Sequence, residues 1–122
     1  MEDIDPIKAW KFVVEIDGHM IGVMKVEGLT SKGPGWLSLT RGFVVETPML
    51  RDWGNDIKNP GAAKKTIKVV VDGRLTFEFQ ECEPLSLTYG DLDAGSSGIL
   101  TETLGVMFER VSVLEVVRDE EI

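Results

Sequence analysis

Apolar and polar side chains alternate with a period of two along most of the chain, which is typical of β-strands with one buried face. Within residues 11–17 every even position is apolar, and charged side chains occupy three of the four odd positions. The Asp-Gly step at 17–18 supplies the positive φ angles of a tight turn, and an apolar run follows it. This pattern predicts a β-hairpin over residues 11–26.

A second hairpin is predicted over residues 66–80. Residues 67–71 and 75–79 carry apolar side chains at their odd positions, and Asp72-Gly73 lies between the two runs. Pro84 follows shortly after. Because proline has no backbone N–H, we expect Pro84 to end the second strand or to leave it at a sheet edge.

Three further strands are predicted, over residues 36–41, 85–89 and 100–109. The glycine- and proline-containing segment 29–35 and the segment 90–98 have the chemistry of turns and loops. The apolar parity changes after Phe108, which predicts a β-bulge near Glu109-Arg110.

One helix is predicted over about residues 48–58. Thr47 can cap its first turn, and Pro48 suits the first helical position. Leu50, Trp53 and Ile57 share one helical face. Together these elements predict a mostly β fold, an antiparallel β-sandwich or barrel of about seven strands with one α-helix. We expect it to form a single domain over residues 1–122.

Charge excludes one class of function. The 122 residues include 21 acidic and 13 basic side chains, for a formal net charge of −8. A protein that wraps nucleic acid needs clustered lysine and arginine to neutralise phosphates, which this balance does not favour. Cys82 is the only cysteine, so the chain has no internal disulfide, and no apolar run is long enough to span a bilayer. We expect folding in the cytoplasm and no membrane partner.

The sequence offers no convincing catalytic or metal site. His19 is the only histidine and falls at a predicted turn, and one histidine with one cysteine excludes the usual zinc ligand sets. Asp91, Asp93 and Glu102 lack the spacing of a calcium loop. Gly95–Gly98 lacks the lysine and the helix of a phosphate loop. We therefore expect no enzyme and no cofactor, and we assign the aromatic side chains to core or subunit contacts.

Six short motifs occur in a fixed order along residues 6–114. They are FVVEIDG (12–18), VEGL (26–29), LTRG (39–42), LRDW (50–53), CEP (82–84) and LTETL (100–104). As an ordered set they resemble the tail-tube proteins of contractile-tailed bacteriophages, which are related to the inner-tube proteins of contractile injection and type VI secretion systems.

The resemblance implies stacked hexameric rings whose sheets join into one barrel around a lumen. That lumen would conduct DNA or a protein effector without sequence-specific binding, in a virion tail or injection particle assembled in the host cytoplasm. Sheath and baseplate proteins would be its other partners. The polar faces of the 66–80 hairpin and of the final strand supply the lumen-lining candidates Lys68, Asp72, Thr76, Glu78, Gln80, Thr101 and Thr103. The inter-subunit and stacking candidates are Trp10, Thr30, Ser31, Lys32 and Trp36.

One departure from the family keeps other functions open. Many members carry a long arm between the GL and LKRG motifs, whereas here only Thr30 to Leu37 lies between them. A short segment suits a tube-initiator or baseplate protein that forms a single ring. A monomeric β-barrel that binds a small ligand or peptide is the alternative from another class.

Overall fold

The computed structural model describes residues 6–59, 61–95 and 98–115. Within these residues the chain is mostly antiparallel β-sheet with one short α-helix, as the sequence predicts, and it forms eight strands where about seven were expected. The elements are β1 (Phe12–Ile16), β2 (His19–Ile21), β3 (Lys25–Glu27), β4 (Gly35–Gly42), α1 (Met49–Gly54), the 3-10 turn η1 (Asn55–Lys58), β5 (Lys65–Val71), β6 (Leu75–Tyr89), β7 (Thr101–Phe108) and β8 (Arg110–Glu115).

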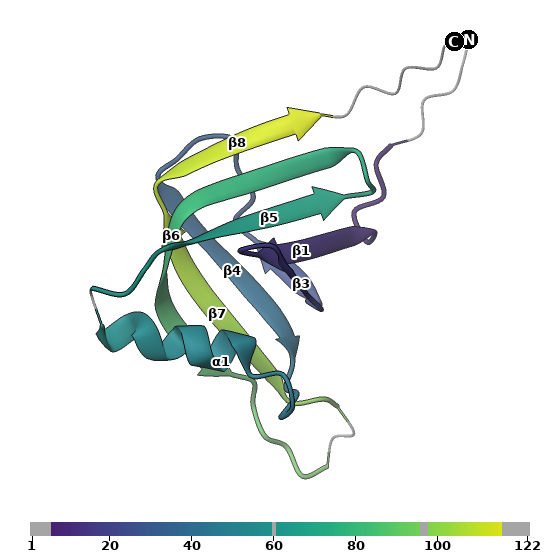
Figure 1. Cartoon of the computed structure of the whole chain (residues 1–122). Helices are drawn as coiled ribbons and strands as arrows, with labels where there is room; N and C mark the ends of the chain where they lie inside the picture. The colour runs from purple at the N-terminus through teal and green to yellow at the C-terminus, as the bar shows by residue number, and fades with distance from the viewer. Residues whose placement is uncertain (1–5, 60, 96–97, 116–122) are drawn as a thin grey trace.

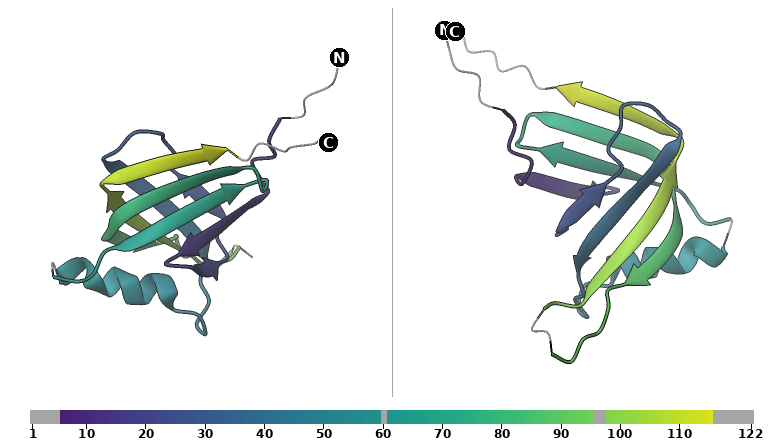
Figure 2. Two further views of the ribbon diagram at one scale, coloured as in Figure 1. Left: turned by 45° about the horizontal axis from the view of Figure 1, so that its top comes forward. Right: turned by 180° about the vertical axis from the view of Figure 1, so that it is seen from behind.

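The strands form two layers that share β6 (Figures 1 and 2). Sheet A has the order β2-β1-β5-β6-β8 and uses residues 75–82 of β6. Sheet B has the order β3-β4-β7-β6 and uses residues 83–89 of β6. The apolar faces of both sheets meet in a core that includes Val14, Leu39, Phe79, Leu104 and Phe108, and α1 packs against the part of β6 in sheet B.

Both Asp-Gly turns are confirmed. Asp17 and Gly18 have φ of 49° and 84°, and Asp72 and Gly73 have φ of 54° and 65°. These positive values are the ones a two-residue hairpin turn requires. The hairpins themselves pair β1 with β2 and β5 with β6.

The separation of β6 into two strands at Pro84 was wrong. The strand continues through Pro84 and bends where Glu81 takes a φ of 61°, with a register shift between Pro84 and Ser86. In the described parts of the chain, residues 83–89 pair only with β7. Pro84 therefore lies in an edge strand, where the loss of its N–H is tolerated.

Two predicted continuous strands instead divide between the sheets. The apolar run at 20–26 becomes β2 in sheet A and β3 in sheet B. The expected bulge at Glu109-Arg110 is the point at which the chain leaves β7 in sheet B and enters β8 in sheet A. A parity change alone does not distinguish a bulge from a corner between layers, because both break the period of two.

The helical segment is confirmed over residues 49–58, but its cap is not. Pro48 occupies the N-cap position and no side chain caps the turn, so Thr47 does not act as predicted. Leu50 and Trp53 are buried, whereas Ile57 is 38% exposed. Ile57 belongs to η1, and the three residues per turn of a 3-10 helix rotate it away from the face that α1 buries.

Candidate functional site

A buried cluster of three charged side chains connects the motifs found in the sequence. Glu102 of β7 is fully buried and accepts hydrogen bonds from Arg41 Nε of β4 at 2.7 Å and from Arg51 Nη1 of α1 at 3.0 Å. These residues come from the motifs LTETL, LTRG and LRDW. Arg41 shares the parity of Leu37 and Leu39, and Glu102 shares that of Leu104, but sequence reasoning predicted neither their burial nor their contact.

The same arginines fix the loop that follows β4. Arg51 Nη2 donates to the carbonyl oxygens of Val44 at 2.8 Å and Val45 at 3.2 Å, and its guanidinium lies 4.2 Å from the centre of the Phe43 ring. Arg41 Nη2 donates to the carbonyl of Thr47. Residues 43–47 are thus held by charge-assisted hydrogen bonds although they belong to no strand or helix.

The lumen-lining candidates do not share one face. Lys68, Thr76, Glu78 and Gln80 point away from the core on the outer face of sheet A. Asp72 lies in the turn between β5 and β6, where its carboxylate accepts a hydrogen bond from the backbone N–H of Lys8 and pairs with Lys11. Thr101 and Thr103 lie on the outer face of sheet B. The alternating residues of β7, Glu102 and Leu104, are buried and therefore point to the opposite, inner face. The seven candidates therefore divide between two layers, because the 66–80 hairpin belongs to sheet A and β7 belongs to sheet B.

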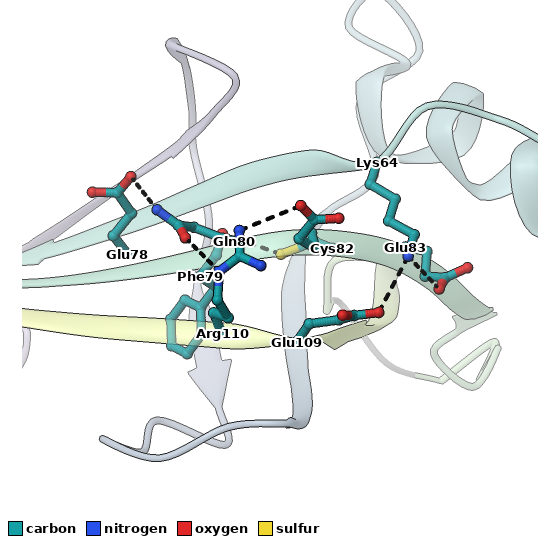
Figure 3. A network of polar contacts seen from close by, with 9 residues as sticks. Lys64, Glu78, Phe79, Gln80, Cys82, Glu83, Glu109 and Arg110 are labelled. Carbon is teal, nitrogen blue, oxygen red and sulfur yellow. Dashed lines mark hydrogen bonds and ion pairs between the residues drawn. The ribbon is translucent and has the colours of Figure 1, made fainter.

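The outer face of sheet A is mixed in character. Across its strands, Glu15 lies opposite Lys68, which lies opposite Glu78, and the next row contains Val13, Val70, Thr76 and Leu114. At the bend of β6, Arg110 donates to Gln80 and Glu81, and Lys64 contacts Glu83 and Glu109 (Figure 3). The hydrogen bond to Glu109 raises the pKa of Lys64, which keeps this solvent-exposed ammonium charged.

The outer face of sheet B is formed by small, mostly neutral side chains. Thr40 and Thr103 are directly opposite, with their hydroxyl oxygens 2.9 Å apart. Ser38 faces Gly105, and Thr88 faces Thr103 from the other side. Charged side chains enter this face at both of its edge strands, as Lys25 and Glu27 in β3 and as Glu83 in β6, which lies opposite Met107.

The inter-subunit candidates also fall on separate surfaces. Trp10 is 74% exposed and borders a surface hollow of about 540 Å³ with Val13 and Val70 of sheet A. Trp36 is 58% exposed and lies opposite Met107 at one end of sheet B. Thr30, Ser31 and Lys32 lie in the loop before β4, where the backbone N–H of Lys32 donates to Thr30 Oγ1.

The part of the chain that the structure describes does not bring together the candidate chemical groups of the sequence. His19 is exposed at the start of β2, and the described residues hold no group of three or more histidine, cysteine or acidic side chains placed to bind a metal. Burial raises the pKa of the Cys82 thiol to about 12, so this cysteine is not a nucleophile in the folded chain. None of the helices among the described residues is long and apolar enough to cross a membrane.

No family model and no curated protein matches the sequence, but solved structures do match the fold. A chain of the PVC sheath-tube complex, an extracellular contractile injection system, is 24% identical with a TM-score of 0.81, over 91% of this chain and 93% of that one. The tube-terminating cap of the anti-feeding prophage gives 20% identity and a TM-score of 0.82, covering 95% of each chain. Hcp2 from Salmonella typhimurium is 12% identical with a TM-score of 0.60, over 92% of this chain and 100% of that one. The chain therefore has the tail-tube-like fold of contractile injection system proteins.

Proposed function

We propose that this chain is a structural subunit of a tail tube or contractile injection inner tube, assembling as hexameric rings that stack around a lumen. The observation that carries the proposal is the fold, which matches a chain of a sheath-tube complex over nearly the whole length of both chains. The same match supports a sheath as partner, a particle as location and a structural role without catalysis. The baseplate is the further partner that such a particle provides.

The free edges of sheet B supply the ring contact. Among the described residues, β3 and residues 83–89 of β6 each pair with a neighbour on one side only. Unpaired edges of this kind invite other strands. If β3 of one subunit meets β6 of the next, six four-stranded sheets close into one barrel, and both edges disappear.

In this arrangement the outer face of sheet B lines the lumen. Between the ends of β4 and β7 this face consists of serine, threonine and glycine residues. Cargo would meet no cationic side chain and no large apolar side chain there. Thr101 and Thr103 keep their proposed place. Lys68, Asp72, Thr76, Glu78 and Gln80 then lie on the tube exterior, where the apolar row of sheet A is available for other contacts.

DNA or a protein effector is the proposed cargo. Six copies carry a formal charge of −48 (6 × −8), which discourages tight binding of a polyanion to the assembled particle. A neutral hydroxyl surface also suits a protein cargo that must pass without adhering.

Electron microscopy and light scattering of the purified protein test the assembly. Tubes support the proposal, whereas a monomer at all concentrations contradicts it and favours the binding module. Single rings that never stack favour a cap, initiator or baseplate component, and a tube-terminating cap is among the structures with this fold.

Thiol labelling tests which face lines the lumen. Thr103→Cys and Lys68→Cys place a thiol on the outer faces of sheets B and A, and native Cys82 is buried and silent. A polymer-linked maleimide too large to enter the tube should label both variants as monomers but only Lys68→Cys in tubes. The reverse pattern assigns the lumen to sheet A.

A further inference from the structure

One end of the outer face of sheet B carries two large apolar side chains. Trp36 of β4 and Met107 of β7 are directly opposite in the ladder and are 58% and 44% exposed. They point out of the face that carries the serine, threonine and glycine residues, because Leu37 and Val106 next to them are fully buried and point inward. The hydroxyl surface is therefore interrupted at this end by an indole ring and a thioether.

Regular backbone structure fixes the direction of both side chains. The Trp36–Met107 pair is flanked on both sides by further pairs of the β4–β7 ladder. The backbone of Gly28 approaches the Trp36 carbonyl so closely that an added Cβ would lie 2.6 Å from its oxygen. Opposite residues of an antiparallel ladder have their Cβ atoms about 5 Å apart, so the two side chains are neighbours on this face. An apolar surface on a rigid backbone loses little conformational freedom when it binds.

The strands of this face contribute one cation, and it is already paired. Lys25 of β3 lies 3.5 Å from the carboxylate of Glu27. Glu83, opposite Met107 in β6, lies 3.6 Å from Lys64 Nζ (Figure 3). Lys32 lies in the loop before β4, outside these strands. Nucleic acids are held by clustered lysine and arginine, which the described strands of sheet B do not provide on this face. The end of the face that carries the indole and the thioether is suited to bind apolar side chains instead.

We propose that Trp36 and Met107 form an apolar collar around the lumen, and that this collar binds protein cargo through segments that expose apolar side chains. The proposal rests on the proposed function, from which it takes the ring and the lumen, and it names the class of cargo and its binding site. In a ring with sixfold symmetry, the six copies of this pair lie at the same height and face the axis. Contacts that are weak one by one then act together on a single cargo chain.

Tryptophan and methionine suit a cargo of no fixed sequence. Methionine is unbranched and polarizable, so it adapts to partners of different shape and is common at promiscuous binding surfaces. Tryptophan offers a large apolar area with few rotatable bonds, so little side-chain entropy is lost when it binds. The serine and threonine rows beyond the collar offer no comparable apolar contact. Cargo is therefore held at one height in each ring and slides past the rest of it.

Sedimentation velocity of the assembled protein with labelled probes tests the collar. The first probe is an uncharged, unstructured peptide of leucine, phenylalanine and serine that carries a fluorophore. The second is the same peptide with serine at every leucine and phenylalanine, and the third is a short DNA duplex with the same label. Absorbance of the protein reports rings or tubes, and absorbance of the fluorophore reports which probe travels with them. Only the apolar peptide is expected to sediment with the native particles.

Two variants remove one member of the collar each. Trp36→Ser should assemble as the native protein does and bind the apolar peptide about tenfold more weakly, because truncated tryptophans are often the costliest losses at a binding surface. Met107→Gln keeps the unbranched side chain but makes its end polar, and it should weaken binding as well. Leu92→Ser is the control: it removes an apolar side chain that is 86% exposed in the loop before β7, and it should bind the peptide as the native protein does.

Four outcomes contradict the collar and leave the tube standing. They are undiminished peptide binding by assembled Trp36→Ser, DNA binding as strong as that of the peptide, thiol labelling that assigns the lumen to sheet A, and Trp36→Ser rings that no longer stack but still hold the peptide. The last would assign Trp36 to a contact between rings. If Trp36→Ser does not assemble, Met107→Gln decides the question by the same criteria. A native protein that never forms rings overturns the proposed function and the collar with it.

Discussion

Arg41 and Glu102 are directly opposite in neighbouring strands and form an ion pair of 2.7 Å, with side chains only 6% and 0% exposed. Arg51 completes the cluster from α1 at 3.0 Å. Removal of charges from water is costly, and their mutual attraction offsets that cost only while all partners remain. The cluster therefore ties the helix and the 43–47 loop to sheet B, and loss of one partner leaves the others as uncompensated buried charges.

Glu102→Gln should destabilise the chain by about 3–5 kcal/mol, the usual cost of breaking a buried ion pair from one side. The amide preserves the shape of the side chain but leaves two arginines without a counter-charge. Chemical denaturation measures the change. Glu109→Gln, which removes a carboxylate with 55% side-chain exposure, is the control and should change stability by less than about 1 kcal/mol. Equal effects of the two variants would refute a special role for Glu102.

Arg51→Lys should loosen the 43–47 loop while the sandwich stays folded. Lysine retains the charge beside Glu102 but has no planar fork to reach two carbonyls and to stack on Phe43. Hydrogen exchange should become faster at the amide of Phe43, which bonds to Leu100, and stay unchanged in β5. Unchanged protection at Phe43 would show that the arginine does not hold the loop.

Local sequence signals predicted the features of this fold that depend on residues close together in the sequence, namely the turns and the inward-facing positions of single strands. Asp17-Gly18 and Asp72-Gly73 took the turn conformations that their chemistry requires, and the alternation around them correctly assigned the inward residues of β1, β5 and the first part of β6. The resemblance to tail-tube proteins rested on the order of such motifs, and the structural matches bear it out at the level of the fold.

Assignment of strands to layers could not be predicted in the same way. The sequence indicates that Glu78 and Thr103 both point outward, but the two outer faces belong to different sheets. The chain changes layers at Glu81 and Glu109, and no periodicity identifies a corner as distinct from a bulge. Long-range pairs such as Arg41 with Glu102, 61 residues apart, were equally inaccessible to local reasoning.

Cys82 should resist thiol reagents in the folded chain. Burial raises its pKa to about 12, so almost no thiolate exists at pH 8, and the side chain is fully buried. In the unfolded chain the ordinary pKa near 8.5 applies, so the folded state retains a proton that the unfolded state releases. Stability from this group is thus fully present below about pH 8.5 and is lost as pH rises toward 12.

Labelling with iodoacetamide at pH 8 measures this protection, with denatured protein as the reference for full reactivity. Cys82→Ala should remove this thiol's share of the stability loss at alkaline pH. Labelling of the native protein at the denatured rate would mean that the thiol is accessible.

Gly28→Ala should destabilise the chain by about 1–3 kcal/mol, because two independent features exclude a side chain there. Gly28 has a φ of 98°, and its Cβ would lie 2.6 Å from the Trp36 carbonyl oxygen. Gly22 is the matched control: it lies in the same β1–β4 region without a positive φ, and nothing lies within 4 Å of its added Cβ. Gly22→Ala should be neutral or stabilising by up to about 1 kcal/mol, since alanine restricts the unfolded chain. Denaturant midpoints of the two variants measure the contrast. If both alanines are equally tolerated, the close approach of residue 28 to β4 is not a requirement of the fold.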